Sequence, residues 1–449
     1  MKRFENLKIL LAPHSPSTLA LKKNLENFSI NVIGFIDKNK KDKNIYNIKE
    51  IKKISFDNII IFSPNHFESI YDEYLKYISK DIIYKAEYHL SKYIFKKDII
   101  FNKRKIDILP CNINVKRDKF VFICKSFIGS NNKSFFLYCY KHNINSIILT
   151  DNLHQLDELK KLNLPCELLN TKESDYEIAY AKFIIFDQGN YTYLPKLHKE
   201  QKTIQLWHGV GLKKMSKLNN IKYDYFISTS HWTNNTNFKN IFLANRFLSC
   251  GYPRNDIFMI EEDNVDIILS DKTIYDFVKK KKKEKIILYM PTHREDRTKL
   301  PLDFIILNND LRKLNIYLIV KLHPFMNKLY DKIVFSNILF HNEQGDIYPI
   351  LKYVDILVSD YSSVVYDFLL LDRPIIFFNY DMDEYIKNVE FLFDYTKYSP
   401  GLFVKNQNEL LDAIIKKDKF SEKRLKVREM FFDDLNMLAS EKILEKILG

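Results

Sequence analysis

Two histidines in this chain follow short apolar runs typical of buried strands, and both stand beside residues that suit phosphate chemistry. His208 follows the run 203–206 and precedes Gly209, which has no side chain to keep a substrate at a distance. His323 lies in the sequence KLHP of residues 321–324, after another apolar run. An imidazole can accept a proton from a hydroxyl, or hydrogen-bond a phosphoryl oxygen in a transition state. Although a single histidine is more often structural, the strand-end positions make both of them candidate catalytic residues.

Groups that bind phosphate oxygens follow two further apolar runs. Thr292 and Arg294 come after the run 286–290, and a guanidinium pairs well with phosphate. After a later run, the sequence SDYSS places Ser362 and Ser363 ahead of a helical stretch. At a helix N-terminus, free backbone N–H groups, two hydroxyls and the helix dipole form an anion site suited to a pyrophosphate. Plain N-capping by serine is the alternative interpretation, and it is compatible with phosphate binding.

The elements that must position these residues show the βαβ pattern, because apolar runs of strand length alternate with segments of helical length. The pattern predicts the α/β class, with parallel sheets built from three series of strands and a hinge near residues 255–285. The expected strands are 8–12, 31–36 and 58–62 in the first series, 119–124, 145–149, 183–186, 203–206 and 225–228 in the second, and 286–290, 316–320, 355–358 and 375–378 in the third.

The first series predicts a small Rossmann-like domain over roughly the first 95 residues. Its second strand ends in Asp37, as in folds that bind a ribose. The turn after its first strand, residues 13–17, reads PHSPS and lacks the glycines that let a dinucleotide phosphate approach. We therefore expect an accessory or docking domain that binds no dinucleotide.

The bulk composition indicates a folded, water-exposed protein of more than one domain. The 449 residues exceed one compact core, and 46% hydrophobic with 28% charged residues is a globular balance. No apolar run approaches the roughly 20 residues that span a bilayer. Lys2 and Arg3 precede no apolar stretch with a cleavage site, so we expect a cytoplasmic protein.

Cysteines, carboxylates and net charge exclude some classes of site. The five cysteines are an odd number without a C-x-x-C pair, which favours neither disulfides nor zinc. The sequence DMD at residues 381–383 imitates a metal-binding pair, but we interpret it as a surface loop and expect no metal and no cofactor. The net charge of +13 suits nucleic acid, an anionic membrane face or a polyanionic substrate, and charge alone does not choose among them.

Together these motifs resemble the CDP-glycerol glycerophosphotransferase family, which includes teichoic acid primases and polymerases and related capsule enzymes. The resemblance runs from about Ala181 to the C-terminus, fits residues 119–180 more loosely, and leaves the first 95 residues as an addition to the family core. The motifs that carry it are IQLWHG (204–209) with LKK (212–214), GYPRND (251–256), LYMPTHR (288–294), KLHP (321–324), and SDYSS (359–363) with Asp367 and Phe368.

The resemblance implies a GT-B fold, in which two Rossmann-like domains face each other across the active cleft and no metal is required. The implied domains are an accessory domain at 1–98, an acceptor-side domain at 99–257 and a CDP-donor-binding domain at 258–449. His293 departs from the family, which commonly has an aromatic residue between the threonine and the arginine.

The resemblance also implies roles for individual residues. His208 matches the general base, and His323 matches the histidine near the donor pyrophosphate. Asp367 is placed at the ribose by analogy with related nucleotide-binding folds. The full donor-binding set is Thr292, Arg294, Lys321, Asp360, Ser362, Ser363 and Asp367, and the cleft residues without an assigned role are Gly209, Arg254 and Asp256.

The implied reaction is attack of an acceptor hydroxyl on the β-phosphorus of CDP-glycerol, which expels CMP without a covalent intermediate. The expected acceptor is a lipid-linked polymer or saccharide of teichoic acid or capsule biosynthesis, met by a peripheral enzyme on the inner face of the membrane, and nucleic acid is not an expected partner. Two alternatives stay open. The same fold could transfer ribitol phosphate from CDP-ribitol, or a sugar from a nucleotide sugar, or it could be a non-catalytic binding or scaffold protein.

Overall fold

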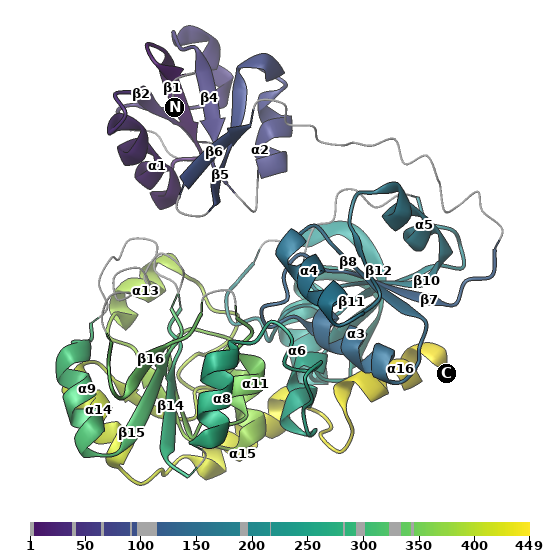
Figure 1. Cartoon of the computed structure of the whole chain (residues 1–449), viewed down its shortest axis with the longest axis vertical. Coiled ribbons are helices and arrows are strands. Elements are labelled where there is room, and N and C mark those ends of the chain that lie inside the picture. Colours follow the sequence, from purple (N-terminus) through teal and green to yellow (C-terminus); the bar gives the residue numbers. More distant parts are fainter. Residues whose placement is uncertain are drawn as a thin grey trace. The chain divides into compact units, whose positions relative to one another are not determined.

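A computed structural model of the chain describes residues 4–37, 42–63, 67–89, 92–96, 115–188, 196–215, 217–281, 283–292, 301–322, 334–342 and 345–449. The chain divides into two compact units, residues 1–103 and 104–449 (Figure 1). Among the described residues, no helix combines the length and the apolar character needed to cross a bilayer.

The first unit contains one six-stranded sheet with the strand order β3-β2-β1-β4-β5-β6. All neighbouring strands are parallel except β5 and β6, which form an antiparallel pair. Apolar side chains from α1 cover one face of the sheet, and those from α2 and η2 cover the other. The elements are β1 (Lys8–Ala12), α1 (Pro16–Glu26), β2 (Asn31–Ile36), β3 (Ile45–Tyr46), η2 (Ile48–Lys53), β4 (Asn58–Ile61), α2 (Phe67–Tyr74), η3 (Lys80–Ile82), β5 (Ile83–His89) and β6 (Lys92–Lys96).

The second unit begins with a seven-stranded parallel sheet in the order β13-β12-β11-β10-β7-β8-β9. Helices α3 and α4 cover one face, and α5 and α7 cover the other. Its elements are β7 (Lys119–Ile123), α3 (Asn131–Lys141), β8 (Ser146–Thr150), α4 (Leu153–Lys161), β9 (Cys166–Leu168), α5 (Lys172–Tyr180), β10 (Ala181–Phe186), β11 (Lys202–Gln205), β12 (Leu218–Ser228), α6 (His231–Thr233), η5 (Asn234–Phe238), α7 (Lys239–Ile241), β13 (Phe242–Ser249) and η6 (Pro253–Phe258).

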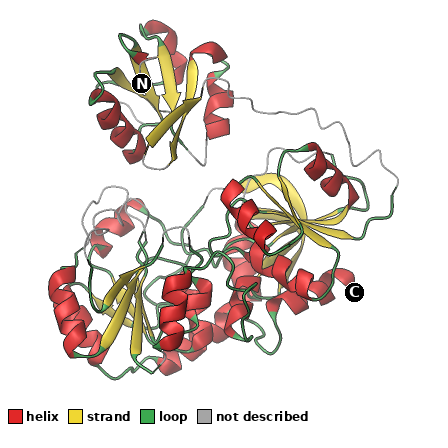
Figure 2. Cartoon of the chain, viewed as in Figure 1, coloured by secondary structure: helices red, strands yellow, loops and turns green. Residues whose placement is uncertain are grey.

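A six-stranded parallel sheet follows, in the order β16-β15-β14-β17-β18-β19. Figure 2 shows helices on both of its faces, with α9 and α14 packed on one and α8, α11, α12 and α15 on the other. Its elements are α8 (Lys272–Lys280), β14 (Lys285–Tyr289), α9 (Phe304–Lys313), β15 (Ile316–Val320), β16 (Ile338–Phe340), α11 (Tyr348–Leu351), β17 (Ile356–Ser359), α12 (Val364–Phe368), η7 (Leu369–Leu371), β18 (Ile375–Phe378), α13 (Met382–Asn388), β19 (Leu402–Val404), α14 (Gln407–Ile415), α15 (Ser421–Phe431) and α16 (Ala439–Leu448).

The α/β class and every strand expected from the apolar runs are confirmed, with ends that differ by at most two residues, except that β12 begins seven residues before the expected run. These strands are continuous apolar runs because helices bury both faces of each sheet. The expectation that residues 381–383 form a surface loop is wrong. Asp381 is buried, accepts a hydrogen bond from Tyr361 Oη at 3.2 Å, and directly precedes α13.

The C-terminal helix α16 does not pack with the sheet that precedes it in the chain. Its residues Ile443 and Ile447 lie in the core of the seven-stranded sheet, beside side chains of α3. Asp256 holds its first turn, because the carboxylate accepts hydrogen bonds from the backbone N–H groups of Ala439 at 2.7 Å and Ser440 at 3.0 Å. The last helix of the region 258–449 therefore packs against the preceding, seven-stranded sheet. Asp256 caps the N-terminus of this helix.

We predict that Asp256→Ala lowers the free energy of unfolding by about 1–3 kcal/mol, because two buried N–H groups at the start of α16 lose a charged acceptor. Urea unfolding at pH 8 measures the change. Asp310→Ala on α9 is the control, since it removes only a pair with Lys313 one turn away. Equal unfolding midpoints for wild type and Asp256→Ala would show that α16 is held by its apolar face alone.

Candidate active site

The polar strand ends singled out in the sequence gather where strand order reverses in the two sheets of the second unit. In the seven-stranded sheet the chain runs outward in both directions from the adjacent strands β7 and β10, and in the six-stranded sheet from β14 and β17. At such a point, the connections leave in opposite directions and open a crevice at the carboxyl ends of the strands. His208 follows β11, next to β10, while Thr292 and Ser362 follow β14 and β17.

These strand ends line one cleft with a volume of about 420 Å³. One wall is formed by residues 207–213 and 215, which follow the seven-stranded sheet, and the other by residues 290–292, 321–322 and 361–363, which follow strands of the six-stranded sheet. The structure therefore brings His208 and Gly209 to the same cleft as Thr292, Lys321, Ser362 and Ser363.

The His208 ring is oriented by a backbone hydrogen bond. Its Nδ1 atom lies 3.0 Å from the carbonyl oxygen of Asp187, the residue that follows β10. Because a carbonyl only accepts, Nδ1 must carry the hydrogen, and in the neutral ring the lone pair is then on Nε2. The indole of Trp207 packs against the imidazole with ring centroids 3.9 Å apart. His208 is thus held as a hydrogen-bond acceptor through Nε2.

The electrostatic surroundings keep this imidazole neutral. His208 is open to the cleft, but the surrounding protein displaces much of its water, and this burial lowers its pKa to about 4. The hydrogen bond to the Asp187 carbonyl opposes the shift, and the positive charge of Arg254 adds to it. At neutral pH the ring is therefore unprotonated, and the lone pair on Nε2 can accept a hydrogen bond.

The loops after β14 and β17 are tied together. The backbone N–H of Thr292 donates to Asp360 Oδ1 at 2.8 Å, and Ser359 Oγ donates to the carbonyl of Met290 at 2.6 Å. Asp360 is 1% exposed, so it holds the Thr292 main chain from behind the cleft surface. Two hydrogen bonds therefore connect the residues after β14, expected to bind donor phosphate, to the end of β17.

Ser362 and Ser363 directly precede α12, as expected from the sequence. Both serines line the cleft, and Ser362 Oγ accepts from the backbone N–H of Val364 at 3.5 Å. All five residues of α12 are buried. Its N-terminus thus points to the cleft from within the core of the domain.

Lys321 lines the cleft but its ammonium is engaged inside the domain. Nζ lies 3.2 Å from Nδ1 of His341 and donates to the carbonyl of Gly345 at 3.1 Å, and the residue is 8% exposed. Burial and the charge of Lys321 lower the pKa of His341 to about 4, so that ring is a neutral acceptor for the ammonium.

Asp367 does not face the cleft. It is 0% exposed; its Oδ2 atom accepts from Arg254 and from Tyr348 Oη, and Oδ1 accepts from Asn255. A ribose would have to displace these partners to reach the carboxylate. Its contacts are those of an internal ion-pair partner, which differs from the ribose-binding position expected from the sequence.

Three of the residues singled out in the sequence are not described by the structure, and a fourth lies outside this cleft. His323, Arg294 and His293 lie outside the described residues. Asp256 caps α16 and does not line this cleft.

Two residues that hold the His208 loop escaped the sequence analysis. Asp187 supplies the carbonyl for His208, and its carboxylate accepts from Ser130 Oγ and from the backbone N–H of Asn132 at 3.1 Å. Burial raises the pKa of Asp187 to about 6. Asn131 Nδ2 donates to the carbonyl of Trp207 at 2.8 Å. The position of Asp187 directly after an expected strand was the available signal.

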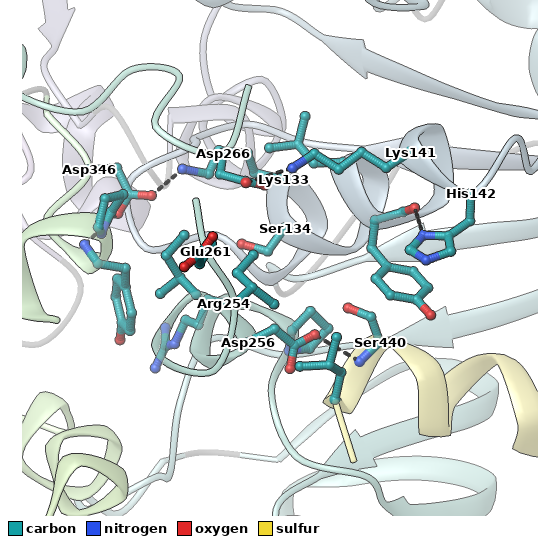
Figure 3. Close-up of a pocket in the computed structure, with 18 residues that line it drawn as sticks. Lys133, Ser134, Lys141, His142, Arg254, Asp256, Glu261, Asp266, Asp346 and Ser440 are labelled. Carbon is teal, nitrogen blue, oxygen red and sulfur yellow. Dashed lines mark hydrogen bonds and ion pairs between the residues drawn. The ribbon is translucent and has the colours of Figure 1, made fainter. Parts of the chain in front are cut away.

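A second cavity of about 200 Å³ lies between the two sheets of the second unit, lined by residues of α3, η6, α11 and α16 and by Asp346 (Figure 3). Its charged side chains pair with each other, as Lys133 does with Asp346 and Lys141 with Asp266. Neither His208 nor the serine pair lines it. We therefore assign the chemistry to the larger cleft.

Within the described parts of the chain, no group of three or more His, Cys, Asp or Glu side chains is placed to hold a metal ion.

Comparison with known families gives one match that covers most of the chain. The family described as CDP-glycerol:poly(glycerophosphate) glycerophosphotransferase matches residues 111–449. This region holds both parallel sheets of the second unit and the cleft between them.

Curated relatives include enzymes for two kinds of polymer. A teichoic acid poly(ribitol-phosphate) polymerase of Bacillus spizizenii is 30% identical over 299 residues, which are 61% of this chain and 47% of that protein. A teichoic acid glycerol-phosphate transferase of Staphylococcus aureus is 29% identical over 289 residues, covering 56% of this chain and 72% of the relative. The chain thus spans about half the length of the first of these relatives.

Solved structures of the wall teichoic acid polymerase TagF share the fold. One of them, with CDPG, matches 77% of this chain and 91% of that chain with a TM-score of 0.61 and 24% identity. At this identity the likeness shows the fold alone.

We predict that Gly209→Ala lowers the free energy of unfolding by about 1–3 kcal/mol. Gly209 has φ +136°, and an added Cβ would lie 2.9 Å from Arg254 Nη2 and 3.0 Å from Ser363 Oγ. Gly211→Ala is the matched control, because a Cβ there meets its nearest atom at 3.5 Å. Urea unfolding of both variants measures the difference. Equal stabilities would mean that the 208–209 loop is not confined as described.

We predict that the His208 imidazole titrates with a midpoint near 4, with Nδ1 protonated above that pH. A folded-state pKa below the unfolded value of about 6.5 means that the unfolded chain takes up this proton first, so His208 lowers stability as pH falls from 6.5 towards 4. Nitrogen-15 NMR of histidine-labelled protein follows the titration, and His208→Gln assigns the resonance. A midpoint near 6.5 would contradict the described surroundings.

Proposed function

Because the chain belongs to the CDP-glycerol:poly(glycerophosphate) glycerophosphotransferase family, we propose that it transfers glycerol phosphate from CDP-glycerol to a hydroxyl of a teichoic-acid-like or capsular polymer and releases CMP. The observation that carries this proposal is the cleft shared by a neutral histidine and a serine pair from opposite domains. His208 provides the base, and Ser362 and Ser363 provide donors for phosphate oxygens.

The proposed step follows from these positions. An acceptor hydroxyl donates its proton to Nε2 of His208 while its oxygen attacks the β-phosphorus of CDP-glycerol. The bond from that phosphorus to the oxygen of the α-phosphate breaks, and CMP leaves with the electron pair. CMP is a weak base, so the protein must mainly remove the acceptor proton and stabilise phosphoryl charge. The hydroxyl groups of Thr292, Ser362 and Ser363 are suited to the second task.

The residues outside the described ranges complete the proposed donor site. In the sequence, His323 follows Lys321 and Leu322, and Arg294 lies two positions after Thr292, all three of which line the cleft. We assign His323 to the pyrophosphate and Arg294 to the donor phosphates. Lys321 adds positive charge to the donor side of the cleft, and its contacts with His341 and Gly345 hold its ammonium in place.

The proposed architecture is a GT-B core with an added N-terminal domain. Residues 99–257 carry the acceptor-side base, residues 258–438 carry the donor site, and α16 returns to the first of these domains. Residues 1–98 form an accessory Rossmann-like domain whose first turn lacks a dinucleotide fingerprint. The proposed site needs no metal.

The proposed place of action is the inner face of the cytoplasmic membrane, where a lipid-linked acceptor would be met. The net charge of +13 supports peripheral attachment to anionic lipid. Sedimentation with anionic vesicles at low and high salt tests it, and a protein that stays in solution at low salt would contradict it.

Transfer of ribitol phosphate from CDP-ribitol is the second candidate function. It is favoured by the relative named as a poly(ribitol-phosphate) polymerase, at 30% identity. Competition between CDP-glycerol and CDP-ribitol for one enzyme preparation separates the two, because the preferred donor gives the higher kcat/KM for CMP release.

We predict that acceptor-dependent CMP release from CDP-glycerol persists in EDTA and falls about 10²–10⁴-fold in His208→Ala, because the acceptor loses its base. His323→Ala is expected to fall as well, through loss of its hydrogen bond to the phosphoryl group. His154→Ala on α4 is the control, since His154 is exposed and lines neither cavity. CMP release is measured on a glycerol-phosphate or saccharide-primed acceptor.

Two results would contradict parts of this prediction. Full activity in His208→Ala would remove the assigned base. No release from CDP-glycerol together with release from CDP-ribitol or a nucleotide sugar would leave the cleft standing and change the donor.

A further inference from the structure

Arg254 joins the loop of the proposed base to the donor domain. It lies in η6, where the chain leaves the seven-stranded sheet, and is 5% exposed. Its Nη1 atom donates to the carbonyls of His208 and Gly129, both at 2.9 Å. Its Nη2 atom donates to Asp367 Oδ2 at 2.6 Å, across the domain junction.

The acceptor of this ion pair is itself rigidly held. Tyr348 Oη donates to Asp367 Oδ2 at 2.7 Å, and Asn255 Nδ2 donates to Oδ1 at 2.8 Å. The Arg254 guanidinium also lies over the Tyr348 ring, 4.7 Å from its centroid. Burial opposes the charge of Arg254, but Asp367 raises the pKa of the guanidinium above its usual value, so Arg254 stays charged.

The same arginine lies beside the contact between Gly209 on one wall of the cleft and Ser363 on the other. A Cβ on Gly209 would meet Arg254 Nη2 at 2.9 Å and Ser363 Oγ at 3.0 Å. The main chain beside His208 therefore packs against both the guanidinium and a serine of the proposed phosphate site. Asp367 lies on α12, four residues after Ser363.

Arg254 is not the only link between the domains. Lys133 on α3 pairs with Asp346, and the N–H of Gly129 donates to Asp346 Oδ1 at 3.2 Å. Figure 3 shows Arg254 and the Lys133–Asp346 pair around the junction cavity. A second ion pair thus connects the two parts, but the hydrogen bond to the His208 carbonyl comes from Arg254.

We propose that Arg254 is a positioning residue for group transfer, which sets the distance and orientation of His208 relative to the donor phosphate held beside Ser362 and Ser363. This inference rests on the proposed function. Attack requires the reacting atoms about 3–3.5 Å apart, and a displacement of about 1 Å can cost about 10²-fold in rate. A guanidinium can donate to two carbonyls and a carboxylate at once, and a lysine ammonium lacks that planar geometry.

The first test compares Arg254→Lys with Arg117→Lys in the full chain. Arg117 is the matched control, because it is also buried, donates to the Ala179 carbonyl and pairs with Glu200 away from the cleft. We expect kcat for CMP release to fall about 10²-fold in Arg254→Lys. The Kd for CDP-glycerol, measured by calorimetry, stays at the wild-type value because a lysine ammonium can still pair with Asp367 and so keep the start of α12 in place. An equal loss in kcat/KM and donor affinity would overturn the proposal.

A double variant separates positioning from folding. Arg254→Gln alone leaves Asp367 buried without its counter-charge, so it is expected to lose stability. Adding Asp367→Asn removes that charge and restores stability in urea unfolding, but it does not restore the guanidinium bonds to His208 and Gly129. We expect kcat to stay low in the double variant. Recovery of kcat together with stability would reduce Arg254 to a structural residue and overturn the proposal.

The His208 NMR signal keeps this inference separate from the proposed function. If wild type releases CMP from no donor, the proposed function fails, yet the His208 resonance still reports the geometry of its loop. A changed His208 shift and titration midpoint in Arg254→Lys, with neither changed in Arg117→Lys, would support positioning by Arg254. A His208 signal identical to wild type in Arg254→Lys would overturn it.

Discussion

The buried ion pair between Arg254 and Asp367 is the interaction on which the geometry of the cleft depends. Removing two charges from water costs several kcal/mol for each ion, so such a pair persists only where further hydrogen bonds satisfy both partners. Here Tyr348 and Asn255 donate to the carboxylate, and the carbonyls of His208 and Gly129 accept from Nη1 of the guanidinium. Because separating these groups costs electrostatic free energy, the ion pair keeps the two walls of the cleft in a fixed relative position.

Parallel-sheet topology supplies the rest of the site. In each sheet of the second unit, polar loops follow the strands where strand order reverses, and both reversals open onto the same cleft. The helices on both sheet faces bury the strands fully, which leaves the carboxyl ends as the place for polar chemistry. His208 and Ser363 therefore meet although more than one βαβ unit separates them in the sequence.

The strands were predictable because burial on both faces selects continuous runs of apolar residues, such as Ile286 to Tyr289. The start of α12 after Ser363 was predictable because serine favours the beginning of a helix. The roles of the acidic residues could not be predicted from the sequence. Asp256 and Asp367 lie within family motifs, but one caps a distant helix and the other neutralises Arg254. Such roles depend on partners more than 100 positions away.

The sequence by itself determined the α/β class, the strands and the strand-end residues that suit phosphate chemistry, because these depend on local apolar patterning and residue type. The tertiary structure alone decided which polar groups face the cleft and which are hydrogen-bonded or ion-paired inside the protein. It set the tautomer of His208 through the Asp187 carbonyl and turned Lys321 towards His341 and Gly345. It also returned α16 to the earlier sheet. The reason is that burial and hydrogen-bond partners come from chain segments far apart in sequence, which no local pattern encodes.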